Sequence, residues 1–282
     1  MNAQQSTKRY FVLGNPIAQS LSPVIHAAFG AQTGIALDYQ RKEIPLGQFA
    51  AHLRSLQRDG VAGVNVTMPF KLDAFACATR VSARAKLAQA ANTLKFDGAE
   101  IVADNTDGAG LQADITQNLA CNLQGKSVLL LGAGGAAMGV AASLLDAHVA
   151  RLSVLNRSHA KAVALAVQFA HLGPIAALQS EDAAQIKFDV IINATSASLT
   201  PSADAPIWAD IRQVAADGLA YDMMYGAKST AFMHDFAALG VRASDGLGML
   251  VEQAAEAFYV WHGIRPETAT VIAQIRAQLA AK

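Results

Sequence analysis

The pattern of apolar and polar residues along this chain predicts short strands that alternate with helices. Segments at 10–14, 36–44 and 61–68 read as strands, and helical patterns fill 24–32 and 46–58 between them. The alternation returns in the second half of the chain. This order predicts an α/β fold.

The stretch from residue 61 to residue 71 contains the first candidate site. The period of two places alternate residues on two faces of the strand, with Val64, Val66 and Met68 on one and Gly63, Asn65 and Thr67 on the other. Pro69 has no N–H and ends the pairing, and Lys71 opens the next segment. Ligands of open α/β sheets bind beyond the carboxyl ends of strands, so an amide, a hydroxyl and an ammonium group gather where a ligand is expected. The alternative is a strand that frays into a polar turn.

A pair of serines lies before the first predicted helix. Ser22 and Pro23 form a good N-cap and first-turn pair for the helix at 24–32, which explains Ser22 without a ligand. The same duty does not explain Ser20. Its hydroxyl lies beside a helix N-terminus, where an anion is favoured.

A polar run follows a predicted hairpin at 92–103, which turns at Asp97 and Gly98. The run covers 104–108 and includes Asp107. A turn followed by a helix cap would account for such a sequence. The carboxylate of Asp107 would still be available to a ligand. A helix at 111–119 then leads out of the first domain.

A glycine-rich turn opens the second half of the chain. The uncharged run at 127–145 is nearly long enough to span a bilayer, but its four glycines favour a buried strand at 127–131, a tight turn and a helix. The turn matches the G-x-G-x-x-A pattern with Gly132, Ala133, Gly134, Gly135 and Ala136. A strand before it, a helix after it and a further strand at 152–155 complete the context of a dinucleotide site, in which the helix N-terminus favours the pyrophosphate.

The residues after the strand at 152–155 indicate which dinucleotide binds. An NAD site usually has an acidic residue there, but this chain has Asn156, Arg157 and Ser158, with Lys161 close behind. Cations at this place suit the 2′-phosphate of NADP. The alternative is that these residues only form the solvated start of a helix. This alternative explains Lys161 better than it explains Arg157.

The last third of the chain continues the same architecture. Strands are expected at 188–193 and 218–222, and both end in polar residues where a nucleotide site would open. A long helix from 245 to 261 carries Gln253, and the last helix runs from about 267 to 279.

Composition restricts the class of protein. A chain of 282 residues is long enough for two domains, and the 22 basic and 22 acidic residues balance, so neither nucleic acid nor an anionic membrane is an expected partner. Cys77 and Cys121 have no metal-binding spacing, and a reduced compartment fits them. The first ten residues lack the apolar core of a signal peptide. We expect a cytoplasmic protein, and a homodimer is compatible with these features.

Several short motifs together resemble one family. The motifs are Ser20-Leu21-Ser22-Pro23, Asn65 to Lys71, Ala91-Asn92-Thr93-Leu94, Asp104 to Gly108, Gly132 to Ala136, Asn156-Arg157-Ser158, Asn193-Ala194-Thr195-Ser196 and Asp245 to Gln253. In order and approximate spacing, from Tyr10 to the C-terminus, this series resembles the shikimate dehydrogenase (NADP-dependent) family.

The resemblance implies a fold and a reaction. It implies a substrate-binding catalytic domain at 1–120, completed by C-terminal helices at 246–282, and a Rossmann-type, doubly wound NADP domain at 121–245, with a cleft between them. The implied reaction is reversible hydride transfer between NADPH and 3-dehydroshikimate, giving shikimate. Two rivals stay open, a paralogue that prefers quinate or another ring acid and a catalytically silent NADP-binding sensor.

The resemblance also implies roles for single residues. Lys71 matches the family's catalytic lysine and Asp107 its partner. The substrate would be held at its carboxylate or at its hydroxyls by Ser20, Ser22, Asn65, Thr67, Asn92, Tyr225 and Gln253. The cofactor would contact Gly132, Ala133, Gly134, Gly135, Ala136, Asn156, Arg157, Ser158, Lys161, Met223 and Gly246.

The expected chemistry needs one proton transfer. A hydroxyl that loses hydride from its carbon must also lose its proton, and Lys71 is the best candidate to accept it. Asp107 could hydrogen-bond the same hydroxyl and hold Lys71. Which of the two dominates stays open, since a nearby carboxylate raises a lysine pKa against the depression that proton transfer prefers.

Overall fold

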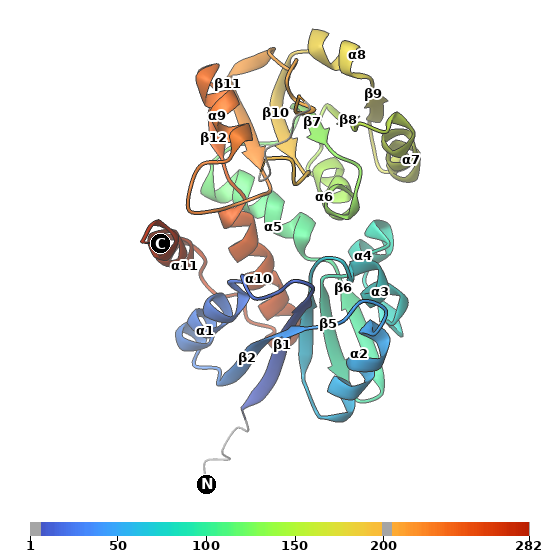
Figure 1. Cartoon of the computed structure of the whole chain (residues 1–282), viewed down its shortest axis with the longest axis vertical. Coiled ribbons are helices and arrows are strands. Elements are labelled where there is room, and N and C mark those ends of the chain that lie inside the picture. The colour runs from blue at the N-terminus through green and yellow to red at the C-terminus, as the bar shows by residue number, and fades with distance from the viewer. Residues whose placement is uncertain (1–6, 199–204, 282) are drawn as a thin grey trace. The chain divides into compact units, whose positions relative to one another are not determined.

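A computed structural model describes residues 7–198 and 205–281 of the chain (Figure 1). Strands and helices alternate through these ranges, and the strands form two sheets of six strands each. The predicted α/β fold class is therefore confirmed. The chain divides into two compact units, 1–107 with 251–273 (unit 1) and 108–250 with 274–282 (unit 2).

The limits of the units differ from the expected domain limits at 120/121 and 245/246. The residues after Asp107 pack into unit 2, where a Cβ on Gly108 would lie 2.2 Å from Oγ of Ser143, and where Tyr221 Oη donates to Asp114 Oδ2 at 2.5 Å. The end of the last helix joins unit 2 through Arg276, which pairs with Asp245. The division into functional domains stays a prediction.

Unit 1 contains a mixed sheet. Its order is β2-β1-β3-β5-β6-β4, with β1 parallel to both neighbours and β5 antiparallel to both of its own. The strands are β1 (Lys8–Gly14), β2 (Leu37–Glu43), β3 (Gly63–Val66), β4 (Arg80–Val81), β5 (Thr93–Asp97) and β6 (Glu100–Asp104). The predicted hairpin at 92–103 is confirmed as β5 and β6.

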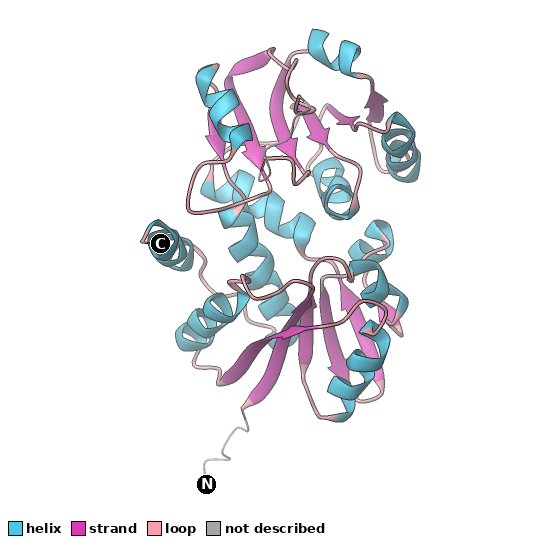
Figure 2. Cartoon of the chain, in the orientation of Figure 1, coloured by secondary structure: helices cyan, strands magenta, loops and turns pink. Residues whose placement is uncertain are grey.

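Helices cover both faces of the sheet of unit 1 (Figure 2). Apolar residues of α2 (Phe49–Arg58) and α3 (Lys71–Ala76) pack with Val64 and Val66 on one face. The other face packs against α10 (Leu247–His262), whose Trp261 contacts Tyr10. The remaining helices with residues in this unit are α1 (Ser22–Thr33), α4 (Ala83–Ala88) and α11 (Ala269–Ala280).

Unit 2 contains a fully parallel sheet of the Rossmann order. Its strands lie as β12-β11-β10-β7-β8-β9, the doubly wound order in which the sequence direction reverses between β7 and β10. They are β7 (Ser127–Leu131), β8 (Arg151–Leu155), β9 (Ile175–Leu178), β10 (Phe188–Asn193), β11 (Val214–Asp222) and β12 (Arg242–Ser244). Such strands are buried on both faces, which explains the apolar run of β7.

Helices flank the sheet of unit 2 as well (Figure 2). One core combines strand residues with Ala183 of α8 and with Phe232 and Phe236 of α9. On the other side, α7 contacts β8 and β9. The helices are α5 (Asp107–Ala113), which continues as the π-helix η1 (Asp114–Asn118), α6 (Gly135–Asp146), α7 (His159–Phe169), α8 (Ser180–Gln185) and α9 (Ala231–Ala238).

Two expectations about local structure are wrong, and several short elements were not predicted. Met68 does not share the buried face of Val64 and Val66, because β3 ends at Val66 and the Met68 side chain is 72% exposed. The helix expected at 111–119 begins earlier and changes to a π-helix. The short elements β4, β9, β12, α8 and α9 were not predicted, because two to eight residues give too little periodicity to recognise.

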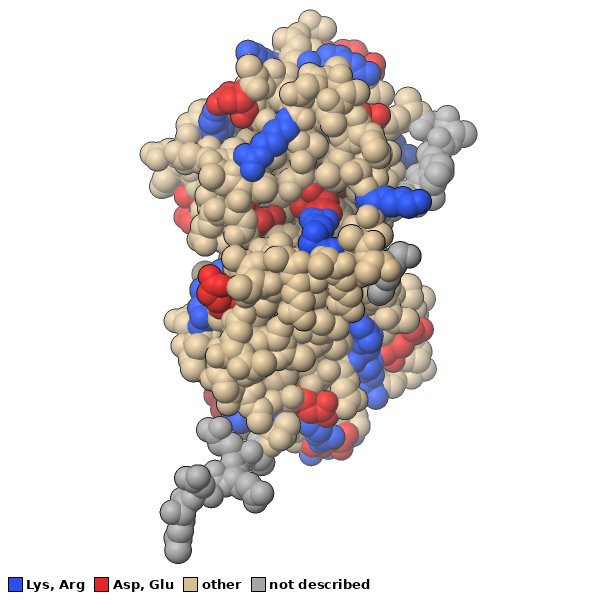
Figure 3. Space-filling model, turned by 90° about the vertical axis from the view of Figure 1, so that its left-hand side faces the viewer, with Lys and Arg blue, Asp and Glu red and all other residues tan. Residues whose placement is uncertain are grey.

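No helix within the described ranges is both long and apolar enough to cross a bilayer. On the face shown in Figure 3, cationic and anionic side chains are interspersed and most of the surface is uncharged.

Candidate active site

The carboxyl ends of β1 and β3 meet at the point where the strand order of unit 1 reverses. The segment after each strand is tied to the other, because the Asn15 N–H donates to Met68 O at 3.0 Å. Ligands of open α/β sheets bind at such points. The segment after β1 leads to Ser20 and Ser22, and the segment after β3 leads to Lys71, so the fold gathers these predicted residues at one edge.

Lys71 and Asp107 form an ion pair. Nζ of Lys71 lies 2.5 Å from Oδ2 of Asp107, and the two side chains are 23% and 9% exposed. Each residue begins a helix, α3 or α5, so each side chain projects from a fixed backbone. The pair that the sequence predicts is therefore present, with the ammonium group accessible to a small molecule.

Asn92 orients the carboxylate of this pair. Its Nδ2 donates to Asp107 Oδ1 at 2.8 Å, and its Oδ1 accepts from the Thr106 N–H at 2.9 Å. Gln253 of α10 joins the same group, since its Oε1 accepts from Asn92 Nδ2 at 3.3 Å and from Thr106 Oγ1 at 3.4 Å. The structure thus brings four predicted residues together, with Thr106 in addition.

Ion pairs hold Gln253 in place. Arg84 of α4 contacts Asp104 of β6 at 2.7 Å and Glu256 of α10 at 2.8 Å. Burial alone would raise the pKa of Asp104, but the hydrogen bonds from Arg84 and Ser82 keep that pKa below its usual range. The pairs fix α10 against the sheet of unit 1, next to the residue that contacts Asn92.

Asn65 lies on β3 with its amide buried. Its Nδ2 donates to Asn92 O at 3.2 Å and to Thr93 Oγ1 at 3.0 Å, and its Oδ1 accepts from Tyr39 Oη at 2.7 Å. Hydrogen bonds therefore link β2, β3 and β5 behind the ion pair. Buried polar groups that satisfy one another in this way stiffen a site.

The expected N-cap role of Ser22 is wrong. The N-cap position of α1 is Leu21, and Ser22 is the first helical residue. The Ser22 N–H instead donates to Ser20 Oγ at 3.3 Å, and the two hydroxyl oxygens lie 3.2 Å apart. The helix thus begins one residue earlier than expected, and no side chain caps it. The two hydroxyls lie together, as joint recognition of a carboxylate requires.

Thr67 and Tyr225 lie in different units. Thr67 follows β3, its N–H donates to Leu13 O at 2.9 Å, and its methyl group approaches Gly14, where a Cβ would lie 2.6 Å away. Tyr225 follows β11 of unit 2, and burial raises the pKa of its phenol. The predicted contribution of Tyr225 to the same ligand as Ser20 stays a prediction.

Sequence reasoning missed three members of this network. Thr93 and Thr106 lie inside motifs that were recognised, directly after Asn92 and before Asp107, so their positions carried a signal. Tyr39 carried none, because it is a single tyrosine in a predicted strand with no recognised motif around it. The structure shows that its hydroxyl bonds to Asn65.

The glycine turn of unit 2 has the shape of a phosphate-binding loop. Gly132 has φ of 106°, and its N–H donates to Leu155 O at 2.8 Å. A Cβ on Gly134 or Gly135 would meet no described atom within 4 Å. The protein itself would therefore have room for a side chain at both positions. The two glycines leave this space open at the start of α6, where it suits a ligand. No described side chain caps that helix, which leaves its first N–H groups available to an anion.

The turn lies at the switch point of the parallel sheet. A Cβ on Gly132 would lie 3.0 Å from Cγ2 of Thr195, which follows β10. The Asn193 side chain holds this second loop through the N–H of Thr195 at 3.0 Å and donates to Asp222 at 2.9 Å. Dinucleotides bind at this position in Rossmann folds.

The residues expected at the 2′-phosphate lie at the end of β8. Arg157, Ser158 and Lys161 are exposed, and Asn156 donates from Nδ2 to Ser158 O at 3.0 Å. Two cations without bulky neighbours beside a dinucleotide turn fit a phosphate monoester better than a bare ribose.

Met223 and Gly246 are in direct contact. A Cβ on Gly246 would lie 2.4 Å from Met223 O, and the Gly246 N–H donates to Met224 O at 3.0 Å. The close approach explains why residue 246 is a glycine. It brings together two residues that are separated in the sequence and were both expected at the cofactor.

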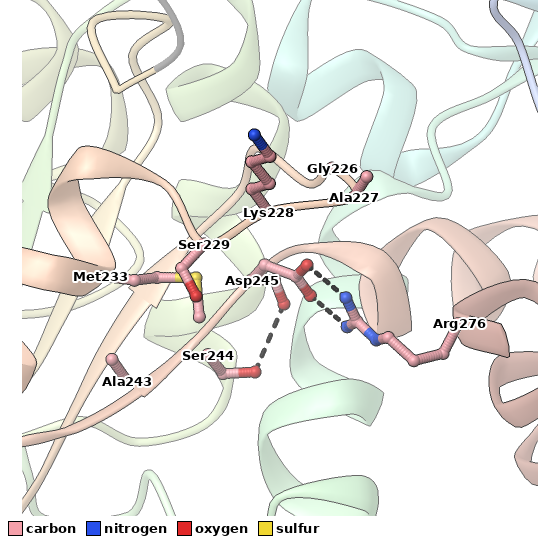
Figure 4. A pocket seen from close by; sticks show the side chains of 9 residues that line it. All are labelled: Gly226, Ala227, Lys228, Ser229, Met233, Ala243, Ser244, Asp245 and Arg276. Atoms are coloured by element: carbon pink, nitrogen blue, oxygen red, sulfur yellow. Dashed lines mark hydrogen bonds and ion pairs between the residues drawn. The ribbon is translucent and has the colours of Figure 1, made fainter. Parts of the chain in front are cut away.

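A hollow of about 270 Å³ lies in unit 2 near the start of α10 (Figure 4). Arg276 reaches Asp245 through two hydrogen bonds of 2.6 and 2.5 Å, and the Lys228 side chain points away from this pair. The arginine is thus engaged in holding α11 to unit 2. The hollow contains no residue expected at the substrate or the cofactor.

Among the residues that the structure describes, no group of three or more His, Cys, Asp or Glu could hold an ion. The two cysteines are separate and half-buried, and burial raises the pKa of each thiol.

The Rossmann sheet, its glycine turn and the lysine–aspartate pair define a two-unit α/β protein of the dinucleotide-binding oxidoreductase class. Three family profiles match the chain, the shikimate dehydrogenase substrate binding domain at 12–94, shikimate / quinate 5-dehydrogenase at 114–203 and the shikimate 5′-dehydrogenase C-terminal domain at 246–276. The chain belongs to the shikimate dehydrogenase family.

Relatives match almost the whole chain. A shikimate dehydrogenase (NADP(+)) of Herminiimonas arsenicoxydans is 54% identical over 97% of this chain and 98% of its own. A shikimate 5-dehydrogenase of Thermus thermophilus, solved with NADP(H) and shikimate, is 32% identical with a TM-score of 0.86, covering 97% of this chain and all of that one. An Ael1 enzyme of Pseudomonas putida is 44% identical with a TM-score of 0.88, covering 95% of this chain and 98% of that one.

Proposed function

We propose that this protein is an NADP-dependent shikimate dehydrogenase, which reversibly reduces 3-dehydroshikimate to shikimate in the biosynthesis of chorismate and aromatic amino acids. The observation that carries the proposal is the Lys71–Asp107 pair, 2.5 Å apart and oriented by Asn92, at the switch point of the sheet of unit 1. A protein that only senses NADP would need no such pair.

Lys71 serves as the proton donor in the reducing direction. The nicotinamide supplies the hydride when NADPH is bound. The carbonyl oxygen that becomes a hydroxyl must gain a proton, and the ammonium group of Lys71 is the acid within reach of solvent at this edge. In the oxidising direction the neutral amine takes the proton from the hydroxyl.

Asp107 holds the proton donor and the substrate. Its Oδ2 faces Lys71 and its Oδ1 faces Asn92, so the carboxylate cannot rotate without losing a hydrogen bond. A fixed carboxylate keeps the ammonium group in one place, and a well-oriented group is a large part of the advantage of an enzyme over solution. It can also accept a hydrogen bond from a substrate hydroxyl.

The remaining predicted residues divide between the two ends of a small ring acid. Ser20 and Ser22 offer two hydroxyls to the carboxylate, with Tyr225 of unit 2 as a third. The ring hydroxyls would contact Asn65, Thr67, Asn92 and Gln253. The proposal takes 1–120 and 246–282 as the catalytic domain and 121–245 as the NADP domain.

The cofactor residues belong to unit 2. The turn from Gly132 to Ala136 would take the pyrophosphate, and Arg157, with Asn156, Ser158 and Lys161, would take the 2′-phosphate. Met223 and Gly246 would lie at the nicotinamide end. The open space that Gly134 and Gly135 leave supports this assignment.

One assay separates the proposed function from its rivals. The reduction of NADP⁺ is followed with shikimate and with quinate as substrates, at equal enzyme concentrations. Faster turnover of shikimate is expected. Equal or faster turnover of quinate would assign the protein to the quinate-preferring paralogues, and no turnover of either would favour the sensor.

Assembly and location complete the proposal. A homodimer in the cytoplasm is compatible with the balanced charge. Neither nucleic acid nor membrane is a proposed partner. Light scattering coupled to gel filtration measures the assembly directly.

A further inference from the structure

Tyr39 is a residue of the polar network that the proposed function does not use. It lies on β2 and is 8% exposed, and its ring stacks on that of His26 at 4.3 Å with an angle of 8° between the planes. The stacking would be equally good for a phenylalanine. What distinguishes the tyrosine is its hydroxyl, which is buried and donates to Asn65 Oδ1 at 2.7 Å.

The neighbours of Asn65 leave its amide only one orientation. The group facing Asn92 O at 3.2 Å must be the nitrogen, because a backbone carbonyl accepts hydrogen bonds and cannot donate. The same nitrogen faces Thr93 Oγ1, whose own proton goes to Asn92 Oδ1 at 3.0 Å. The amide oxygen therefore faces Tyr39, and the tyrosine hydroxyl is the donor.

This arrangement decides what Asn65 can offer to a ligand. Both amide protons are used by the protein, and one lone pair of the oxygen is used by Tyr39. The side chain of His26 also acts on Asn65, but neither of its ring nitrogens makes a hydrogen bond among the described residues. One lone pair of the oxygen therefore remains, so Asn65 can accept a hydrogen bond but has none to give. A ring hydroxyl can supply that proton, whereas a ketone oxygen cannot.

The tyrosine hydroxyl also stays a donor at any working pH. Burial raises the pKa of Tyr39 well above its ordinary value, and the nearby hydroxyl of Ser22 lowers it by a smaller amount. Tyr39 thus lies near the serine proposed for the carboxylate and bonds the asparagine proposed for a hydroxyl. Both contacts are within unit 1.

We propose that Tyr39 is a positioning residue, whose hydroxyl holds Asn65 as a pure hydrogen-bond acceptor for a ring hydroxyl that does not take part in the reaction. The inference rests on the proposed function, because it takes Asn65 to face the substrate. It also restricts the orientation of the substrate. The oxygen that alternates between ketone and hydroxyl must lie at Lys71, and a hydroxyl that persists through the reaction must lie at Asn65.

The test uses Tyr39→Phe, which removes one oxygen and keeps the ring on His26. Shikimate binding is measured by titration calorimetry on the full-length enzyme, so that the result does not depend on turnover. We expect the Kd to rise about 3- to 10-fold, the effect of one net hydrogen bond. Tyr10→Phe is the matched control, since Tyr10 is a buried tyrosine of the same aromatic cluster whose ring packs on Trp261. Its Kd should change less than 2-fold.

Deoxy analogues separate positioning from a structural role. Analogues of shikimate that each lack one ring hydroxyl are titrated against the wild type and Tyr39→Phe. The rise in Kd caused by Tyr39→Phe should disappear for one analogue that lacks a non-reacting hydroxyl. It should persist for the other analogues. A general loosening of the site would give the same penalty for every analogue.

The outcomes are distinct. A penalty confined to one hydroxyl supports the positioning role. An equal penalty for all analogues, no penalty at all, or no binding of shikimate to the wild type overturns it. Binding with the expected pattern but without turnover would overturn the proposed reaction and leave the role of Tyr39 standing.

Discussion

The two candidate sites of this protein are built from different materials. In unit 1, side chains such as Lys71, Asp107 and Asn92 make the site, and they are hydrogen-bonded to one another. In unit 2, the site consists of backbone at a glycine turn, where Gly134 and Gly135 leave open space. Both lie where the strand order of a sheet reverses.

The difference follows from what each site would hold. A reacting carbon needs a proton donor at one fixed position, and an interlocked set of side chains supplies that precision. A pyrophosphate needs several N–H donors and no bulk, which a helix N-terminus with glycines supplies. Substitutions should therefore damage chemistry in unit 1 and cofactor binding in unit 2.

The largest expected effect is that of Lys71→Met. The loss of a general acid–base group should lower kcat by about 10²- to 10⁴-fold, with a smaller change in KM. Asp107→Asn should also reduce turnover, and the double variant should be little worse than Lys71→Met, because the two residues act as one unit.

Steady-state kinetics of the three variants measures these effects, with circular dichroism to verify folding. Lys86→Met, a substitution of an exposed lysine on α4, is the control and should keep full activity. A folded Lys71→Met enzyme with near-normal kcat would place the proton transfer elsewhere.

Gly134→Ala tests the site made of backbone. The new methyl group meets no described atom within 4 Å, so the melting temperature should stay unchanged. It would occupy the space of the pyrophosphate, and overpacking of about 3 kcal/mol corresponds to a rise of about 100-fold in the Kd of NADP⁺.

Fluorescence titration with NADPH measures this loss. Gly173→Ala is the control, because its Cβ would make only ordinary contacts with Leu145 in the same unit. Unchanged affinity in Gly134→Ala would show that the phosphate does not approach this turn.

Arg157→Ala tests the choice of cofactor. A guanidinium can hold the 2′-phosphate through two parallel hydrogen bonds, and bonds to charged groups contribute about 1.5–3 kcal/mol. We expect the ratio of NADP⁺ to NAD⁺ affinity to fall about 10-fold or more. Lys187→Ala, which removes another exposed cation of unit 2, should leave the ratio unchanged. An equal loss for both cofactors would mean that Arg157 does not contact the 2′-phosphate.

The smallest expected effect concerns His26, a buried exception to the paired side chains of unit 1. Neither ring nitrogen has a hydrogen-bond partner among the described residues, and burial lowers the pKa of His26 from 6.5 to about 3, against a smaller opposite effect of Asn65. Below pH 6.5 the unfolded chain gains a proton that the folded chain cannot take up until about pH 3. Stability that is present above pH 6.5 is therefore lost as the pH falls through this window.

His26→Phe should remove this sensitivity to acid. At pH 5.5, one unit below the unfolded pKa, the stability of the variant relative to the wild type should be higher by about 1 kcal/mol than at pH 7. Urea unfolding at the two pH values measures the gain. The same loss of stability in both proteins would show that another group is responsible.

Much of the fold could be read from the sequence because its signals are local. The apolar run of β7 with the glycine turn after it, and the hairpin with Asp97 and Gly98, depend on residues close together in the chain. The missed elements are short or lie at sheet edges, where β4 has two residues and β12 three. Such strands are specified by their neighbours rather than by their own pattern.

The candidate site was predicted to a similar extent. Motifs of one family identified Lys71, Asp107 and Asn92, because each residue type is required by the expected chemistry. The cap of α1 was predicted wrongly, since Ser22 suits an N-cap by residue type, but the backbone geometry places Leu21 at that position and Ser22 inside the helix.

The sequence by itself determined the fold class, the strand–turn–helix of the dinucleotide site and the identity of the residues at the strand ends. Periodicity, turn chemistry and motif spacing act over a few residues, and the order of amino acids contains them in full. Tertiary structure alone decided which of these residues touch. Asn92 meets Gln253 across 161 positions, and Tyr39 meets Asn65 across 26. Hydrogen bonds between distant segments depend on how strands and helices pack, and no local pattern specifies that packing.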